Sequence, residues 1–149
     1  QDELDLLSLI RNDGRFLVLN VAKKLKQDPR TIIAKIKKLE KQGIIQGYTA
    51  FLNLKSVGYQ LHKICIYFST HEKQEISKII TYIKQNPAVI HIIKSLGSWE
   101  LEAELESNNI NHVYDYIKEL KNNFPEQIKR IDHVTIIEEP KLEFFPNII

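Results

Sequence analysis

Basic side chains cluster in one short stretch of this sequence, and their chemistry suits contact with a polyanion. Residues 23–41 hold eight Lys or Arg residues and two acidic ones, although the net charge of the whole chain is only +2. A concentrated basic stripe attracts phosphate groups and speeds association with nucleic acids. Charge alone would equally fit a solvated, lysine-rich helix face, so the positions of these residues must decide between the two interpretations.

A helix is predicted to carry this basic stretch. Asp28 is a good N-cap, Pro29 suits the first helical position, and Gly43 is expected to follow the last turn. One face of this helix is apolar and must pack against other helices. That face consists of Ile32, Ile36 and Leu39.

The opposite face of this helix is the candidate for contact with DNA. Cations on such a face can bind phosphates and base acceptors, and a small residue lets the backbone approach the base edges. We predict that the face consists of Arg30, Thr31, Ala34, Lys35 and Lys38, with no acidic side chain among them.

Catalytic and metal-binding residues show no comparable arrangement. Cys65 is the only cysteine and lies in an apolar run, so we expect an inert thiol, with no disulfide and no cysteine metal cluster. The histidines lack metal-ligand spacing, and there is no glycine-rich phosphate loop, nucleophile elbow or paired-carboxylate motif. We therefore expect a protein that is not an enzyme and needs no metal or cofactor.

Two further helical patterns precede the basic helix. The first ends before the Asn-Asp-Gly turn at 12–14, and the second covers 17–25, with Asn20 as its expected N-cap. Only residues 26–27 separate the second pattern from the basic helix, which predicts a tight helix-turn-helix. We therefore expect a three-helix, winged-type helix-turn-helix domain over residues 1–44.

Residues 45–60 are predicted to form an extended tether, because Tyr48, Thr49 and Phe51 favour strand conformation. From 61 to 149 the pattern becomes β-α-β-β-α-β, the ferredoxin-like split arrangement, so the fold class is α+β. Strands are expected at 61–70, 89–96, 99–106 and 128–138, and helices at 73–85 and 109–122.

The strand expected at 99–106 alternates apolar residues with glutamates, so one of its faces is acidic. Two helices would cover one face of the sheet and leave the other face for a partner or for water. A dimer that used this face would have to place the glutamates at its rim or pair them with cations.

Short stretches of the sequence also follow one another in a recognisable order. They are Leu4-Asp5, Ala22-Lys23-Lys24-Leu25, Asp28-Pro29-Arg30-Thr31-Ile32, Gly43-Ile44-Ile45, Gly47-Tyr48-Thr49-Ala50 and Gly58-Tyr59. In this order and spacing they resemble the leucine-responsive/asparagine-synthase regulators, the Lrp/AsnC or feast/famine family. The second half resembles the ligand-sensing domain of that family through Pro87, Val89, Gly97 and the run from Glu138 to Leu142.

The resemblance implies a sequence-specific regulator of transcription that binds double-stranded DNA. It implies a homodimer, tetramer or octamer, a small effector such as an amino acid, and a cytoplasmic, nucleoid-associated protein of a prokaryote. It also implies that the effector pocket is lined by Gly97, Ser98, Trp99 and Glu100. There, backbone amides could hold a carboxylate and Glu100 an ammonium group. The family usually has a Gly-Asp pair and a second Asp at these positions, and Trp99 also fits the first core residue of a strand.

Two alternatives belong to other functional classes. One is an enzyme, since siroheme decarboxylases have a similar fold. Resemblance to them would predict that the basic helix face is lost and that His and Arg residues surround a tetrapyrrole. In this chain the second domain has Arg130 as its one arginine. A stand-alone effector-binding or oligomerisation module would not need the basic helix either. The basic face therefore favours the regulator.

Membrane insertion and secretion are not indicated by the sequence. No apolar run approaches the roughly 20 residues of a membrane helix. The acidic start does not resemble a secretory signal. Since the chain contains no methionine, we expect the natural protein to begin before Gln1.

Overall fold

A computed structural model of the chain describes residues 2–142. The described residues form two compact units. One contains the residues before Asn53 together with those after Glu139, and the other spans Asn53–Glu139. No helix within residues 2–142 is both long enough and apolar enough to cross a membrane.

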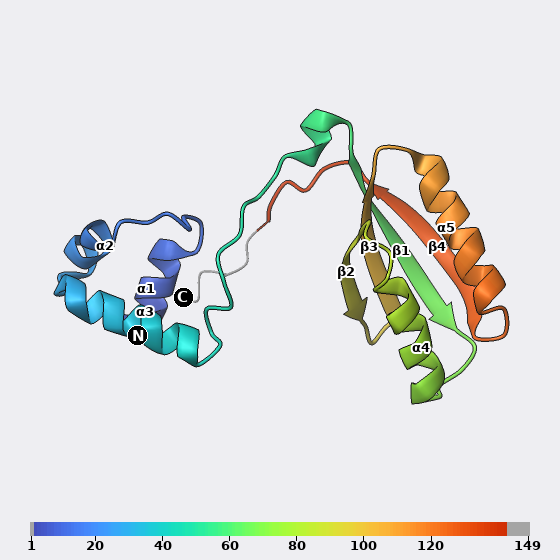
Figure 1. Ribbon diagram of the computed structural model, residues 1–149, viewed down its shortest axis with the longest axis horizontal. Coiled ribbons are helices and arrows are strands. Elements are labelled where there is room, and N and C mark those ends of the chain that lie inside the picture. Colours follow the sequence, from blue (N-terminus) through green and yellow to red (C-terminus); the bar gives the residue numbers. More distant parts are fainter. Residues whose placement is uncertain (1, 143–149) are drawn as a thin grey trace. The chain divides into compact units, whose positions relative to one another are not determined.

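The first unit is a three-helix domain (Figure 1). Its helices are α1 (Asp2–Ile10), α2 (Val18–Leu25) and α3 (Pro29–Lys41). Apolar side chains from all three helices form one core, which confirms the predicted helix-turn-helix arrangement. The buried members of this core are Leu6, Ile10, Val21, Ala22, Ile32, Ile36 and Leu39.

Local interactions fix the ends of these helices. The Asp28 carboxylate accepts a hydrogen bond from the backbone N–H of Arg30 at 2.8 Å, so Asp28 caps α3 as predicted. Lys26 adopts a left-handed conformation with φ of 54°, which ends α2 and turns the chain so that α3 begins after three residues. The cap expected at Asn20 is wrong, because α2 begins earlier, after Leu17, which makes no side-chain cap.

Residues 44–53 contain no strand, and the described part of the first unit contains none elsewhere. A wing of paired strands is therefore not formed by these residues. Tyr48 holds this segment to α3 by donating its phenolic hydrogen to Glu40 at 3.1 Å. The chain then enters the second unit through a short 3-10 helix, η1 (Leu54–Val57).

The second unit is a four-stranded antiparallel sheet with two helices on one face (Figure 1). The strands lie in the order β2-β3-β1-β4. The elements are β1 (Gln60–Phe68), α4 (Lys73–Ile83), β2 (Val89–Lys94), β3 (Leu101–Ser107), α5 (Ile110–Asn123) and β4 (Ile128–Ile136). The predicted β-α-β-β-α-β order is confirmed; the starts at 73, 89 and 128 agree, and the other boundaries differ by one or two residues.

The core of this unit lies between the sheet and the two helices. Side chains that alternate along β1, Ile64 and Ile66, are fully buried against Ile79 of α4 and Leu120 of α5. The residues between them point to the other face of the sheet, which no helix covers.

Candidate nucleic-acid interface and ligand loop

The exposed face of α3 is the first candidate site. Because an α-helix turns by 3.6 residues, the side chains opposite the buried stripe repeat at intervals of three and four. They are Arg30, Ala34, Lys37 and Lys41, all exposed. Three of these four side chains are cationic, and the fourth is small.

Lys35 does not belong to this exposed row. It lies one position before buried Ile36, at the margin of the apolar stripe, and its side chain is only 20% exposed. Its Nζ atom donates to Oδ2 of Asp2 at 3.1 Å and to Oε1 of Gln27 at 2.9 Å. Lys35 is therefore held inside the unit, against α1 and the turn.

Lys38 lies on the same flank of α3 but remains more open. Its side chain is 58% exposed, and its Nζ atom donates to Oε1 of Glu3 at 2.8 Å. Hydrogen bonds from the two lysines lower the pKa values of Asp2 and Glu3. The predicted face contains no acidic residue of α3, but α1 brings the carboxylates of Asp2 and Glu3 to its edge.

Of the predicted DNA-contacting residues, Arg30 and Ala34 lie on the central exposed row. Thr31 is exposed on the flank with Lys35 and Lys38. Lys37 and Lys41 lie on the same exposed row but are not among the predicted residues. A helical wheel centred on Ile32, Ile36 and Leu39 places them there, whereas the predicted set is rotated toward α1.

The loop of Gly97, Ser98, Trp99 and Glu100 connects β2 to β3. Gly97 and Ser98 are exposed, whereas Trp99 and Glu100 are half-buried and make contacts within the unit. Trp99 donates its indole N–H to Oε2 of Glu102 at 3.2 Å. Oε2 of Glu100 accepts the backbone N–H of Phe68 at 3.1 Å, so this carboxylate secures the end of β1.

The uncovered face of the sheet carries an ionic cluster. Lys63 of β1 lies 2.8 Å from the Glu102 carboxylate and 3.2 Å from that of Glu104. His91 of β2 lies 2.9 Å from the second carboxylate oxygen of Glu104. Burial opposes ionisation of Glu104, but the hydrogen bonds from His91 and Lys63 outweigh it and lower its pKa. These two glutamates therefore share the cation of Lys63, and Glu104 has His91 as a second hydrogen-bond partner.

A second polar group lies across β1 and β4 on this face. Tyr67 donates its phenolic hydrogen to Asp132 at 3.0 Å, and the guanidinium of Arg130 lies 3.9 Å from the centre of the Tyr67 ring. Arg130 also pairs with Asp132 at 3.1 Å. Arg130 thus supports the sheet and does not line a tetrapyrrole pocket.

The described residues offer no metal site. Residues 2–142 contain no group of three His, Cys, Asp or Glu side chains that could hold a metal ion. Cys65 is buried between Lys63 and Tyr67 on the uncovered face, and burial raises the pKa of its thiol. A raised pKa disfavours the reactive thiolate, in line with the inert thiol that we expected.

Comparison with known proteins identifies the class of the chain. A helix-turn-helix transcriptional regulator from Pyrococcus abyssi is 38% identical over 120 residues, which cover 78% of this chain and 80% of that protein. The solved structure of an AsnC-family regulator from Pyrococcus furiosus is 27% identical, covers 93% of this chain and 90% of its own, and superposes with a TM-score of 0.75. No protein-family model matches the sequence.

A more distant structure shares the fold. A transcriptional regulator from Neisseria meningitidis, solved as a complex with L-methionine, is 15% identical and has a TM-score of 0.84 over 98% of this chain and 94% of its own. The relatives are regulators of transcription and not enzymes. This chain belongs to the Lrp/AsnC family of helix-turn-helix transcriptional regulators.

Proposed function

We propose that this regulator binds specific sites on duplex DNA through the exposed row of α3. The observation that carries the proposal is the row Arg30, Ala34, Lys37 and Lys41 on a capped helix that follows a three-residue turn. Such a helix can enter the major groove, where arginine and lysine bind guanine and phosphate oxygens and a small residue permits close approach. The chromosome is then the target, so we place the protein in the cytoplasm, on the nucleoid.

The same proposal assigns a role to each part of the chain. Residues 1–44 bind DNA, residues 45–60 act as the tether, and residues 61–149 hold the subunits together and sense an effector. Two-fold symmetry of the dimer would place two copies of α3 on half-sites about one helical turn, or a multiple of it, apart.

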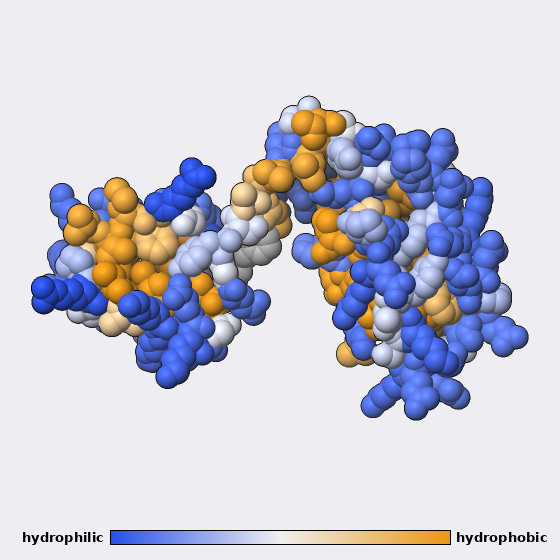
Figure 2. Space-filling view, viewed as in Figure 1, coloured by the Kyte–Doolittle hydropathy of each residue, from blue (hydrophilic) through white to orange (hydrophobic). Residues whose placement is uncertain are grey.

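The uncovered sheet face supports the assembly of two subunits. Its acids Glu102 and Glu104 share the cation of Lys63, and Glu104 also contacts His91, so part of their charge is already compensated within the sheet. Apolar side chains reach the surface along the adjoining β2 edge and loop (Figure 2), where Ile90, Ile93 and Leu96 are 46%, 44% and 105% exposed. Exposed apolar side chains at a strand edge, next to a face whose acids already have partners, form a surface that a second subunit can cover.

An amino acid is the effector class that we propose for the loop at Gly97. The support is the L-methionine bound by the Neisseria meningitidis protein of the same fold. In this chain Glu100 already accepts a backbone hydrogen bond, so exposed backbone groups at Gly97 and Ser98 are the free recognition elements.

The decisive experiment is a DNA-binding titration of the full chain at two salt concentrations with genomic fragments. The wild-type protein should select a subset of fragments, and the Arg30→Ala/Lys37→Ala variant should lose that selection. Equal retention of all fragments by both proteins would refute specific recognition through α3.

A further inference from the structure

A cavity of about 370 Å³ opens in the second unit where β3 ends and α5 begins. It lies at the opposite end of the sheet from the Gly97 loop, since Gln60 pairs with Ser107 at this end and Ile66 with Leu101 at the other (Figure 1). The cavity is therefore separate from the loop to which effector binding was assigned.

One buried side chain in this cavity lacks a partner. Tyr116 is only 6% exposed and lines the cavity, and its hydroxyl has no hydrogen-bond partner at ordinary geometry among the described residues, although the Asn86 side chain lies close enough to act on its pKa. Buried hydroxyl groups are almost always hydrogen-bonded, because their desolvation is costly when no bond replaces water. An unpaired hydroxyl that faces a cavity therefore points to a bound molecule.

The hydroxyl keeps its proton at neutral pH and can therefore donate it in a hydrogen bond. Burial raises the pKa of Tyr116 to about 12, and the nearby Asn86 side chain opposes this shift only in part. The carboxamide oxygen of Asn86 already accepts the backbone N–H of Ala88 at 2.9 Å, so its NH₂ group is the part that can donate to a ligand.

The lining includes one acidic residue, Glu106, and several of its other members suit a negative charge beside an apolar group. Helix α5 has fourteen residues and starts at the cavity, so the positive end of its dipole lies there. His112 in its first turn adds an imidazole, while Ala88 and Leu105 supply apolar wall. The neighbouring Ser107 hydroxyl is already used, since it donates to the Asn109 carbonyl at 2.9 Å.

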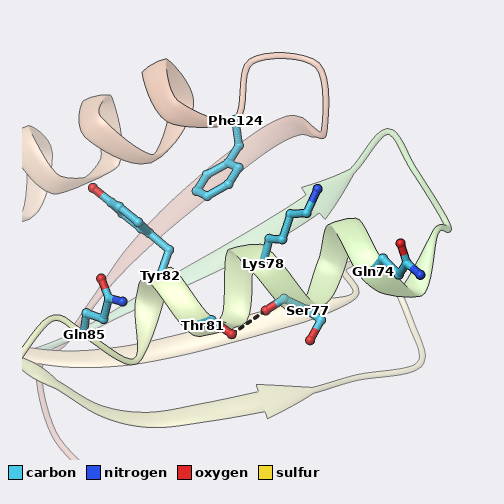
Figure 3. A pocket seen from close by; sticks show the side chains of 7 residues that line it. All are labelled: Gln74, Ser77, Lys78, Thr81, Tyr82, Gln85 and Phe124. Carbon is cyan, nitrogen blue, oxygen red and sulfur yellow. Dashed lines mark hydrogen bonds between the residues drawn. The ribbon is translucent and has the colours of Figure 1, made fainter.

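A second hollow shows why the unpaired hydroxyl matters. It measures about 560 Å³ and lies over α4 and the end of α5 (Figure 3). There Tyr82 donates to Glu119 and accepts from Asn123, and its ring packs edge-on against Phe124. The Tyr82 hydroxyl therefore has both a hydrogen-bond acceptor and a donor within the unit, so this hollow contains no unpaired hydroxyl that would indicate a ligand.

We propose that the cavity at Tyr116 binds a small carboxylic acid, whose carboxylate accepts the Tyr116 hydroxyl proton in a hydrogen bond at the N-terminal end of α5. The short apolar chain of the ligand would pack on Ala88 and Leu105. Inorganic phosphate is the other anion to consider, but a tetrahedral dianion needs more donors than this lining offers. This inference does not depend on DNA binding by α3.

The test uses the full chain, labelled with ¹⁵N, and four probes: butyrate, 2-oxobutyrate, the neutral isostere butyramide, and inorganic phosphate. Butyrate or 2-oxobutyrate should shift the backbone amides of Asn111 and His112 saturably and raise the melting temperature. Concentrations up to about 10 mM cover the weak affinity expected of such small ligands. The amides of residues 97–99 report on the other loop.

Tyr116→Phe should weaken carboxylate binding by about tenfold or more, since it removes a hydrogen bond to a charged group. The variant should fold, because it deletes only an unpaired hydroxyl, and its unliganded melting temperature should not fall. Tyr114→Phe is the matched control, because it removes a hydroxyl from the same helix where the ring packs on His133. It should bind as the wild type does.

Several results would overturn the proposal. They are the absence of saturable shifts at Asn111 and His112 with either carboxylate, equal binding of butyramide, binding of phosphate alone, or unchanged affinity in Tyr116→Phe. A lower unliganded melting temperature in that variant would also count against it, because it would show that the hydroxyl already has a structural partner such as water.

Discussion

The Nζ atom of Lys35 lies 3.1 Å from Oδ2 of Asp2, so a cation of the helix expected to bind DNA is held by an acid of the first helix. Gln27 completes the contact by donating to the same carboxylate oxygen at 3.2 Å. Beside it, Glu3 holds Lys38. The two lysines on the flank of α3 that faces α1 are thus paired with acids. Within residues 2–142, the cations of α3 that form no ion pair include Arg30, Lys37 and Lys41.

Removing the two acids should strengthen DNA binding. In Asp2→Asn/Glu3→Gln, Lys35 and Lys38 lose their carboxylate partners and can turn toward phosphates. Each new phosphate contact should steepen the plot of log affinity against log salt by about 0.9 unit. Fluorescence anisotropy at several salt concentrations measures both quantities. Asp13→Asn is the control, because it removes one negative charge from the turn after α1, where the carboxylate accepts the backbone N–H of Arg15. Equal salt slopes for the wild type, the double variant and this control would contradict the prediction.

The exposed row should contribute more to binding than Lys35. We expect Lys37→Ala and Lys41→Ala each to flatten the salt slope by about one unit, the effect of losing one phosphate contact. Arg30→Ala should cost about 1–3 kcal/mol on specific sites if it reads a base with two hydrogen bonds. Lys35→Ala should have a smaller effect, because the side chain is already paired inside the unit.

Lys118→Ala is the matched control for this series. Lys118 is an exposed lysine of α5 in the second unit, where it pairs loosely with Asp115 at 3.6 Å. Salt slopes measured on one DNA duplex compare all the variants. If Lys35→Ala weakens binding more than Lys37→Ala does, the assignment of the exposed row is wrong.

The difference between the predicted and the observed basic face has a simple physical origin. The N-cap at Asp28, the proline at the first position and the apolar stripe were all predictable, because each depends on residues close together in the sequence. The partners of Lys35 were not, because Asp2 lies thirty-three positions earlier and reaches α3 only when the helices pack. Local patterns identify a helix, whereas tertiary contacts decide which of its charges are free.

The second unit gives the same lesson at Glu100 and Glu102. Alternation along the strand predicted an acidic face correctly, but Glu102 is 7% exposed and is paired with Lys63 of a neighbouring strand. Glu100 was expected to bind an ammonium group, yet it accepts a backbone hydrogen bond at the end of β1. The contact of Glu102 with Lys63 and that of Glu100 with Phe68 both depend on how β3 is aligned with β1, and this alignment cannot be read from the sequence.

Lys63 should contribute strongly to the stability of the second unit, through its ion pairs on the uncovered sheet face. Lys63→Met removes the cation shared by Glu102 and Glu104 and leaves two carboxylates close together in a largely buried position. Breaking a buried ion pair from one side costs about 3–5 kcal/mol, and we expect the lower part of that range because the Lys63 side chain is 28% exposed. Chemical denaturation measures the loss, and light scattering reports any change of assembly.

Two further variants make this prediction specific. Lys63→Met/Glu102→Gln should recover part of the lost stability, because it removes one of the two carboxylate charges that Lys63 no longer compensates. Lys78→Met is the control, since Lys78 makes an exposed i,i+3 pair with Glu75 on α4 and such surface pairs contribute little. A loss in Lys78→Met as large as that in Lys63→Met would refute the importance of the buried cluster.

A histidine pair should make the second unit less stable in mild acid. Nδ1 of His62 lies 3.1 Å from Nε2 of His133, and His62 is fully buried. Burial lowers the pKa of both groups from 6.5, and for His62 the neighbouring His133 lowers it further. The unfolded chain therefore binds protons that the folded pair resists, so stability is fully present above pH 6.5 and falls as the pH decreases below it.

The melting temperature measured from pH 8 to pH 5 tests this directly. The wild type should be constant above neutrality and should lose stability below pH 6.5, with at most about two protons linked to unfolding. His133→Gln keeps a polar partner for His62 but removes one titrating group and one source of repulsion, so its pH dependence should be shallower. His71→Gln, in the exposed loop between β1 and α4, should retain the wild-type profile. Equal slopes in wild type and His133→Gln would show that other groups cause the acid sensitivity.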